Sequence, residues 1–162
     1  MIKRVKILCA AALCVPMLTV AGPDLVLPGL DGRDRAVSEF IGRGQWTVVA
    51  IWSTDCPICK RDMHHMGFLH AEHHRNDAIV LGISIDGSAR KPDIAQFIED
   101  QGLDFVNLIG MPGQIAALGG TFRGTPTYYI YSPKGNLVTR QVGSLTQEAA
   151  EEIILHGNMA GY

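Results

Sequence analysis

Runs of apolar residues mark the buried strands of a sheet. Residues 46–52 and 79–85 form nearly continuous apolar and β-branched stretches, which are typical of strands buried on both faces. Two later runs, at 127–131 and 137–142, are separated by a Ser-Pro-Lys-Gly-Asn segment with the composition of a hairpin turn. The pattern therefore predicts central strands followed by a late antiparallel hairpin.

Helical periodicity occupies the segments between and after these strands. Within 57–75, apolar residues and histidines recur every three or four positions, which indicates an amphipathic helix. A second helix is predicted at 92–101, where the following glycine can end it. A short helix at 114–118 and a closing helix at 146–156, capped by Thr146, complete the helical prediction.

The segment 24–40 has a different pattern, because its short extended pieces are broken by Pro-Gly and Asp-Gly turn signals. It predicts an N-terminal β-hairpin, with Ser38 as a candidate helix cap. One more extended piece is expected at 105–109. Together the elements predict an α/β domain in which a mixed sheet carries helices on both faces.

The first 21 residues have the composition of an export signal. Three cations within the first six residues precede an apolar stretch, and Ala21 stands at the expected cleavage position. The stretch is shorter than the roughly 20 residues that span a bilayer, although an uncleaved membrane anchor is the alternative. We therefore predict a signal peptide at 1–21 and a single periplasmic domain at 22–162.

Composition is that of a small globular protein, with 47% hydrophobic and 19% charged residues in a chain of 162. Three of the 14 Lys and Arg residues lie in the predicted signal, which leaves 11 against 16 Asp and Glu. A basic surface that binds nucleic acid is therefore not expected.

The cysteines carry the candidate chemistry. Cys9 and Cys14 lie in the predicted signal, so Cys56 and Cys59 remain as one C-x-x-C pair. A four-cysteine zinc site would need a second pair, and a disulfide across so short a loop would stabilise the fold little. We therefore interpret the pair as reactive. The start of the predicted helix favours the thiolate form of the nucleophile Cys56, and Cys59, one turn further on, is the resolving thiol.

The residues around this pair resemble a known family. The segment Trp52-Ser-Thr-Asp-Cys-Pro-Ile-Cys-Lys60, with Arg123-Gly-Thr-Pro-Thr-Tyr128 about 70 residues later, resembles the thioredoxin superfamily. It is most similar to the exported TlpA/ResA/DsbE (CcmG)-like thiol:disulfide oxidoreductases. The resemblance covers about residues 24–157. It implies a thioredoxin-like fold, with a central mixed β-sheet flanked by helices and an N-terminal β-hairpin extension.

The resemblance also implies how a substrate binds. Pro126 would be the family's cis-proline facing the cysteines, and the backbone of Thr125 would pair with an extended substrate segment. Trp52, Asp55 and Pro57 would border the same groove. From the residues alone, the alternative is that the Thr-Pro pair only opens a strand.

Two positions depart from the family. Asp55 stands where many thioredoxin relatives have tryptophan, and its carboxylate is expected to oppose thiolate formation at the next residue. Ala50 stands where thioredoxins carry a buried acid, so no proton acceptor for Cys59 is provided there. Glu39, Asp62 and solvent are the open alternatives.

Five of the six histidines fall within eleven residues of one predicted helix, at His64, His65, His70, His73 and His74. The i, i+4 spacing of His70 and His74 can chelate a metal, but a solvated helix end is the plainer interpretation, and no metal site is predicted. Met63 and Met66 are interpreted as core residues.

These observations predict a periplasmic thiol:disulfide oxidoreductase that reduces protein disulfides, as in cytochrome c maturation or a similar process, without an organic cofactor. The expected partners are a protein thiol or disulfide substrate and a membrane electron donor or other redox partner, with no nucleic acid. A copper metallochaperone that uses both thiolates and the helix histidines is the alternative. A thiol peroxidase is disfavoured, because Ser53 replaces the usual threonine three residues before Cys56.

Overall fold

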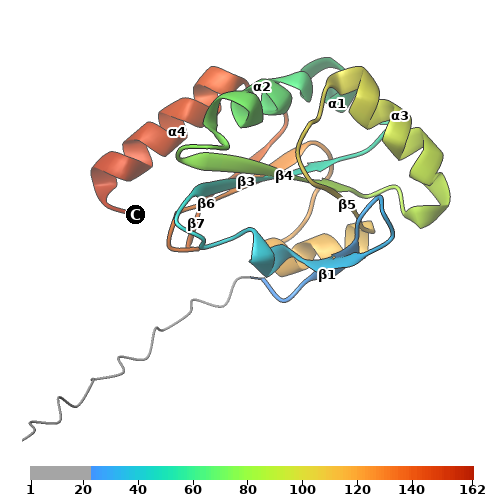
Figure 1. Cartoon of the computed structure of the whole chain (residues 1–162), viewed down its shortest axis with the longest axis horizontal. Coiled ribbons are helices and arrows are strands. Elements are labelled where there is room, and N and C mark those ends of the chain that lie inside the picture. Colours follow the sequence, from blue (N-terminus) through green and yellow to red (C-terminus); the bar gives the residue numbers. More distant parts are fainter. Residues whose placement is uncertain (1–22) are drawn as a thin grey trace, which may run out of the picture.

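A five-stranded mixed sheet forms the centre of the computed structural model, which describes residues 23–162 (Figure 1). The predicted signal peptide at 1–21, with its two cysteines, lies outside the described residues. The strand order is β5-β4-β3-β6-β7. The strands are β3 (Trp46–Trp52), β4 (Ala78–Ser84), β5 (Asn107–Ile109), β6 (Thr127–Tyr131) and β7 (Leu137–Val142).

Strand pairing places β3 in the middle of this sheet. It runs parallel to β4, which in turn is parallel to β5, and it pairs antiparallel with β6. β6 then pairs antiparallel with β7, so the late hairpin predicted from the sequence is confirmed. Every residue of β3 is buried, which agrees with its nearly continuous apolar sequence.

The N-terminal hairpin is also confirmed. β1 (Val26–Pro28) and β2 (Asp34–Ala36) pair antiparallel in a separate two-stranded sheet. Ser38 does not cap a helix, because it lies inside the short 3-10 helix η1 (Val37–Glu39). The N–H of Ala36, just before η1, instead donates to the Glu39 carboxylate, 3.0 Å away.

The helices of the structure are α1 (Pro57–Asp62), α2 (His64–His73), α3 (Lys91–Gln101) and α4 (Gln147–Ala160), with the 3-10 helices η2 (Ser88–Arg90) and η3 (Pro112–Leu118). The single helix predicted at 57–75 is wrong in one respect, because it is divided at Met63. The N–H of Met66 bonds to the carbonyl of Met63, three residues back, which tightens the turn where α1 and α2 meet.

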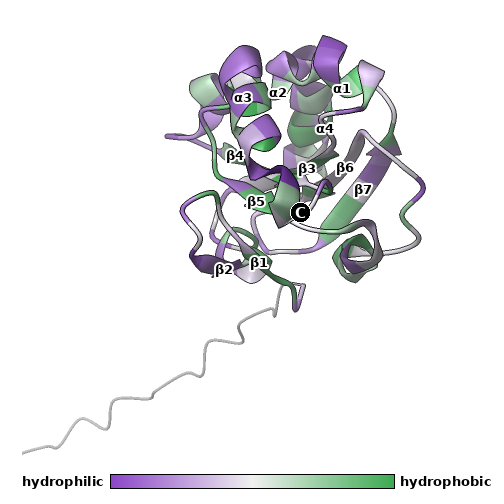
Figure 2. Cartoon of the chain, turned by 90° about the vertical axis from the view of Figure 1, so that its right-hand side faces the viewer, coloured by the Kyte–Doolittle hydropathy of each residue, from purple (hydrophilic) through white to green (hydrophobic). Residues whose placement is uncertain are grey.

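Two apolar layers cover the two faces of the sheet. The four α-helices pack on one face, through residues such as Met63, Ile94 and Ile154. The hairpin, η1 and η3 cover the other face, where Leu27 and Ile115 are buried. Figure 1 shows this division, and Figure 2 shows hydrophilic residues along the outer side of the α-helical layer. Helices therefore do lie on both faces, but those on the second face are only 3-10 turns.

The last helix is longer than predicted. Thr146 caps α4 as expected, and its hydroxyl accepts a hydrogen bond from the N–H of Ala149. The helix then continues through Gly157 to Ala160. Among residues 23–162, no helix has the length and apolar composition needed to cross a membrane.

Candidate active site

The two cysteines lie where the central strand meets the α-helical layer. Cys56 follows the carboxyl end of β3 and is the N-cap residue of α1, with Pro57 in the first helical turn. Proline fits this position, because its missing N–H would have no partner within the helix. The Sγ of Cys56 accepts a hydrogen bond from the backbone N–H of Cys59 at 3.1 Å. This bond and the helix start both favour negative charge on the Cys56 sulfur.

The two thiols differ in their environments. Both are free in the structure, but Cys56 retains 8% of its surface whereas Cys59 is fully buried. Burial, together with the neighbouring Cys56, raises the pKa of Cys59 to about 12. Cys59 therefore stays protonated at neutral pH, and Cys56 is the thiol that solvent reaches first.

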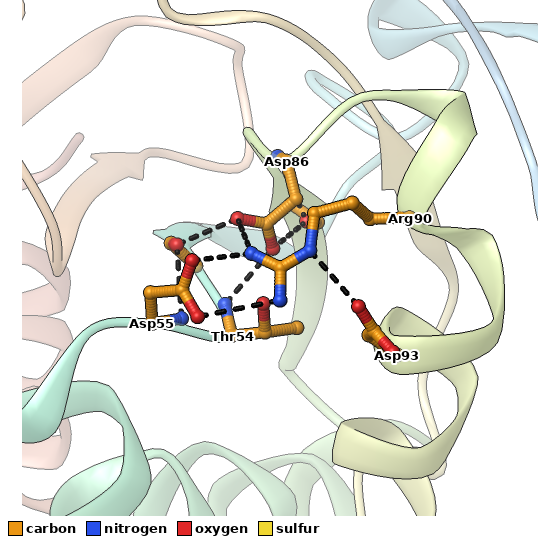
Figure 3. A network of polar contacts seen from close by, with 7 residues as sticks. Thr54, Asp55, Asp86, Arg90 and Asp93 are labelled. Carbon is orange, nitrogen blue, oxygen red and sulfur yellow. Dashed lines mark hydrogen bonds and ion pairs between the residues drawn. The ribbon is translucent and has the colours of Figure 1, made fainter.

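A buried carboxylate holds the loop that precedes Cys56. Asp86 follows β4, and its oxygens accept hydrogen bonds from the Thr54 N–H (2.9 Å), the Ser53 hydroxyl (2.6 Å) and the Ser84 hydroxyl (2.8 Å). Figure 3 shows this carboxylate between the loop and α3. These bonds satisfy polar groups that have little access to water, so they fix the direction in which the chain enters α1.

Arg90 connects this network to the residue beside the nucleophile. Its guanidinium pairs with both carboxylate oxygens of Asp55, with Nη2 3.3 Å from Oδ1, and its Nε donates to Asp93 at 2.9 Å (Figure 3). The hydrogen bond from Arg90 lowers the pKa of Asp55. Asp55 is thus negatively charged, but a cation compensates it directly. The repulsion of the Cys56 thiolate expected from the sequence is correspondingly weaker.

The Thr125-Pro126 segment immediately precedes β6 and lies near Cys59. The peptide bond between these residues is cis. The Thr125 side chain lies near the Cys59 thiol and favours its charged form, which lowers the pKa of Cys59 against the effect of burial. Thr125 is half-buried and Pro126 is buried.

The seven residues predicted for the site do not all reach the surface. Asp55 and Pro57 are exposed beside Cys56. Trp52, in contrast, is fully buried, with its ring stacked on Phe97 at 4.5 Å and its indole N–H bonded to Asn107 at 3.2 Å. Trp52 therefore supports the site from below and has no surface for direct contact with a substrate.

The two carboxylates considered as proton acceptors lie in different places. Glu39 belongs to η1, on the sheet face opposite the cysteines, and bonds to Arg35 at 3.0 Å. Asp62 ends α1, the helix that starts beside Cys56, and is nearly buried. Hydrogen bonds from Arg61, at 2.6 and 2.7 Å, and from Ser144 outweigh burial and lower the pKa of Asp62 to about 2.

The histidines at the carboxyl end of α2 contact other residues of the protein. The Nδ1 of His70 accepts the Val80 N–H at 3.1 Å, and burial lowers the pKa of His70. The ring of His74 stacks on that of His70 and bonds to the His70 carbonyl. Burial opposes the charging of His73, but Asp77 and Glu151 outweigh it and raise its pKa. These contacts tie the cluster to β4 and α4 instead of to the two thiols.

Sequence reasoning missed Asp86 and Arg90. A signal for Asp86 was present, because it follows the end of the strand expected next to the central one, and parallel strands end at the same edge of a sheet. Arg90 carried no comparable signal, since its pairing with Asp55 depends on the path of the chain between β4 and α3.

A thioredoxin-like sheet with a slightly exposed thiol at a helix start and a second, fully buried thiol three residues later is typical of a thiol-disulfide oxidoreductase. The chain belongs to the AhpC/TSA family, whose model matches residues 19–140.

Individual relatives agree with this class. The chain is 26% identical over 133 residues to the thiol-disulfide oxidoreductase ResA of Halalkalibacterium halodurans, covering 81% of this chain and 72% of ResA. It is 22% identical to the thiol:disulfide interchange protein DsbE of Allochromatium vinosum, covering 85% and 74%. The fold is similar to the thiol:disulfide interchange protein of Chlorobium tepidum, with a TM-score of 0.71, 18% identity and coverage of 88% and 98%. The chain is therefore a thiol-disulfide oxidoreductase with a thioredoxin-like fold.

Proposed function

We propose that this enzyme works in the periplasm and reduces disulfides of other proteins through the dithiol of Cys56 and Cys59. The observation that carries the proposal is the asymmetry of the pair. Cys56 keeps 8% of its surface exposed and its sulfur accepts the Cys59 N–H, whereas Cys59 is fully buried and protonated. Cys56 thus attacks the substrate disulfide first, and Cys59, within the same turn of helix, attacks in the second step.

The reaction proceeds by two exchanges. The Cys56 thiolate attacks one sulfur of the substrate disulfide, that S–S bond breaks, and the other substrate sulfur leaves as a thiolate. Cys59 then loses its proton and attacks the Cys56 sulfur of the mixed disulfide. The second substrate thiolate departs, so the substrate is reduced and the protein holds a Cys56–Cys59 disulfide.

Substrate binding is assigned to the rim of the site. The Thr125 backbone is proposed to pair with an extended substrate segment, with Pro126 shaping the groove and Pro57 and Asp55 bordering it. Main-chain pairing makes recognition depend little on substrate side chains. A membrane electron donor or other redox partner would restore the dithiol after each cycle.

The boundaries are part of the proposal. Residues 1–21 act as a signal peptide that is cleaved after Ala21 or retained as an anchor, and 22–162 form one thioredoxin-like domain. Fractionation of cells that express the full chain, with mass measurement of the exported product, tests this assignment. A product that begins at residue 22 is expected.

The direction of exchange is tested by the equilibrium reduction potential in a dithiothreitol or glutathione series. A value near or below about −270 mV, that of thioredoxin, supports the reductase. A value that approaches about −120 mV, that of a strong oxidant, would reverse the proposed direction.

The roles of the two thiols are tested by trapping. Cys59→Ser should accumulate a mixed disulfide with the protein substrate, because the resolving thiol is missing. Cys56→Ser should abolish exchange and trap little. Equal trapping by the two variants would overturn the assignment.

A further inference from the structure

A buried tyrosine hydroxyl belongs to the residue paired with Ala50, the β3 residue that stands where thioredoxins carry a buried acid. Ala50 of β3 has no titratable group, and its direct cross-strand partner in β6 is Tyr128. Paired residues of an antiparallel ladder point to the same face of the sheet. Here that face is the one on which Cys56 and Cys59 are packed. Ala50 thus contributes no polar group at this level of the sheet, where Tyr128 is fully buried and its partner in β7, Gln141, is half-buried.

The Tyr128 hydroxyl is a buried polar group without a hydrogen-bond partner in the described part of the chain. Its side chain is fully buried, and the oxygen finds no hydrogen-bond partner among residues 23–162. Such a group is costly to bury, so a partner that forms in another state of the protein is a natural explanation. Burial, with the nearby sulfurs and Asp62, raises the pKa of Tyr128, so the phenol keeps its proton and is available as a donor.

The other groups around Cys59 leave room for a further hydrogen-bond donor to its thiolate. The Cys59 thiol lies against Cys56, the Ser53 backbone and the Thr125 side chain. Asp62 is negatively charged and already accepts from Arg61 and Ser144. A carboxylate with so low a pKa is a weak base and repels a second anion nearby. Neutral donors can stabilise a thiolate here, and Thr125 and Tyr128 carry hydroxyls close to the two sulfurs.

We propose that the Tyr128 hydroxyl donates a hydrogen bond to the Cys59 sulfur when this thiol ionises, and so speeds the second exchange of the catalytic cycle. The inference rests on the proposed function and concerns its resolving step. Cys59 releases its proton to water, and Tyr128 keeps its own. The Cys59 thiolate then attacks the Cys56 sulfur, the mixed disulfide breaks, and the substrate thiolate leaves.

The test separates the two exchanges in one experiment. The reduced full chain, with Cys9 and Cys14 replaced by serine, is mixed with the aromatic disulfide 5,5′-dithiobis(2-nitrobenzoate), which releases one coloured thiolate when Cys56 attacks. It releases a second when Cys59 resolves the mixed disulfide. Tyr128→Phe removes only the hydroxyl, so the first phase should be unchanged. The second should slow about tenfold, the effect of losing one hydrogen bond to a charged group. Its pH profile should also move to higher pH.

Tyr129→Phe is the matched control. The Tyr129 hydroxyl is also buried without a partner in the described part of the chain, but this residue packs on the opposite face of the sheet. It should leave both phases unchanged. A second phase within twofold of the wild-type rate in Tyr128→Phe, with an unshifted pH profile, overturns the proposal. Equal slowing by the two variants does so as well.

A second measurement does not depend on turnover. In a Cys56→Ser background, the pKa of Cys59 is followed by NMR with and without Tyr128→Phe. A higher Cys59 pKa in the double variant supports the hydrogen bond, and an unchanged one refutes it. Failure of the proposed function looks different, because the wild-type chain would then show no second phase or would fail to reduce protein disulfides.

Discussion

The guanidinium of Arg90 pairs with the carboxylate of Asp55, the residue immediately before Cys56. The charge that the sequence places beside the thiolate is therefore balanced by a cation that lies 35 residues further along the chain. Both side chains have contact with solvent, with 36% of Arg90 and 72% of Asp55 exposed. The pair thus lies at the surface, immediately beside Cys56.

This pairing predicts unequal effects of its two members. Asp55→Asn should change the alkylation rate of Cys56 at neutral pH little, because the guanidinium of Arg90 stays paired with Asp93 and near Asp86. Arg90→Gln should slow alkylation by about twofold to fivefold, the range expected for an exposed charge pair, since it leaves Asp55 uncompensated. The rates are measured with iodoacetamide in a Cys59→Ser background.

The double variant Asp55→Asn/Arg90→Gln is the control for this prediction, and it should return to near the wild-type rate. The effect of Arg90→Gln should also shrink as salt is added, because exposed charges are screened. If the double variant is as slow as Arg90→Gln alone, Arg90 acts by holding the loop and not by charge.

Asp86 is predicted to be the residue on which the loop before Cys56 depends most. Asp86→Ala leaves the Thr54 N–H and two hydroxyls without their acceptor. The loss should be about 2–3 kcal/mol in the free energy of unfolding, because buried donors are left unsatisfied. Asp93→Ala is the matched control, since Asp93 also binds Arg90 but is exposed, and it should change stability by less than about 0.5 kcal/mol. Equal urea midpoints for the two variants would contradict the prediction.

Much of the architecture follows from sequence patterns because burial alone determines it. The run 46–52 is apolar at every buried position except Thr47, whose hydroxyl bonds to the Phe40 carbonyl, and the late hairpin has the predicted bounds. The division of the helix at Met63 could not be predicted in this way. The same periodicity continues through 57–73, and only the backbone bond from Met66 reveals the tightened turn.

In the site as well, some features could be predicted from the sequence and others could not. Cys56 and Cys59 were identifiable because their chemistry depends on a local spacing, which the helix start preserves. Asp55 was recognised as a charge, but its compensation by Arg90 was not, because that contact joins two loops. The resemblance in sequence predicts Trp52 at the groove. In the structure, alternation along β3 places this side chain on the face of the sheet that the α-helices cover, and it is buried there.

Cys59 is predicted to resist alkylation in the folded, reduced protein. It is fully buried and its pKa is about 12, so at pH 8 neither access nor ionisation favours reaction. Of these two thiols, iodoacetamide should label only Cys56 in the native protein and both Cys56 and Cys59 in denaturant. Mass spectrometry of peptides after cysteine labelling checks this. A native protein that carries label mainly on Cys59 would refute the assignment of the two thiols.

The same raised pKa predicts how stability depends on pH. A thiol with a higher pKa in the folded state ionises first in the unfolded chain, where its value is 9.0. The contribution of Cys59 is therefore fully present below about pH 9 and is lost as the pH rises toward about 12. The reduced protein should lose stability more steeply across this window than Cys59→Ser does. Parallel curves for the two proteins in urea unfolding would contradict this expectation.

Gly157 is predicted to be the position at which α4 tolerates no larger residue. A Cβ built there would lie 2.1 Å from Cη2 of Trp46, which is fully buried and bonded through its indole N–H to Asn158 at 2.8 Å. Alanine normally favours a helix over glycine by about 1 kcal/mol. Here the ring cannot move away without losing its packing and its hydrogen bond. Gly157→Ala should therefore be destabilising, by about 1–3 kcal/mol in urea unfolding.

Gly113→Ala is the control for this prediction, because nothing lies within 4 Å of the position that its Cβ would occupy. It should be neutral or slightly stabilising, since alanine restricts the unfolded chain. Trp46 lies at the opposite end of β3 from the cysteines, so disulfide exchange by the folded fraction of Gly157→Ala should match the wild-type rate. A Gly157→Ala protein as stable as the wild type would show that α4 can shift outward from β3 at little cost.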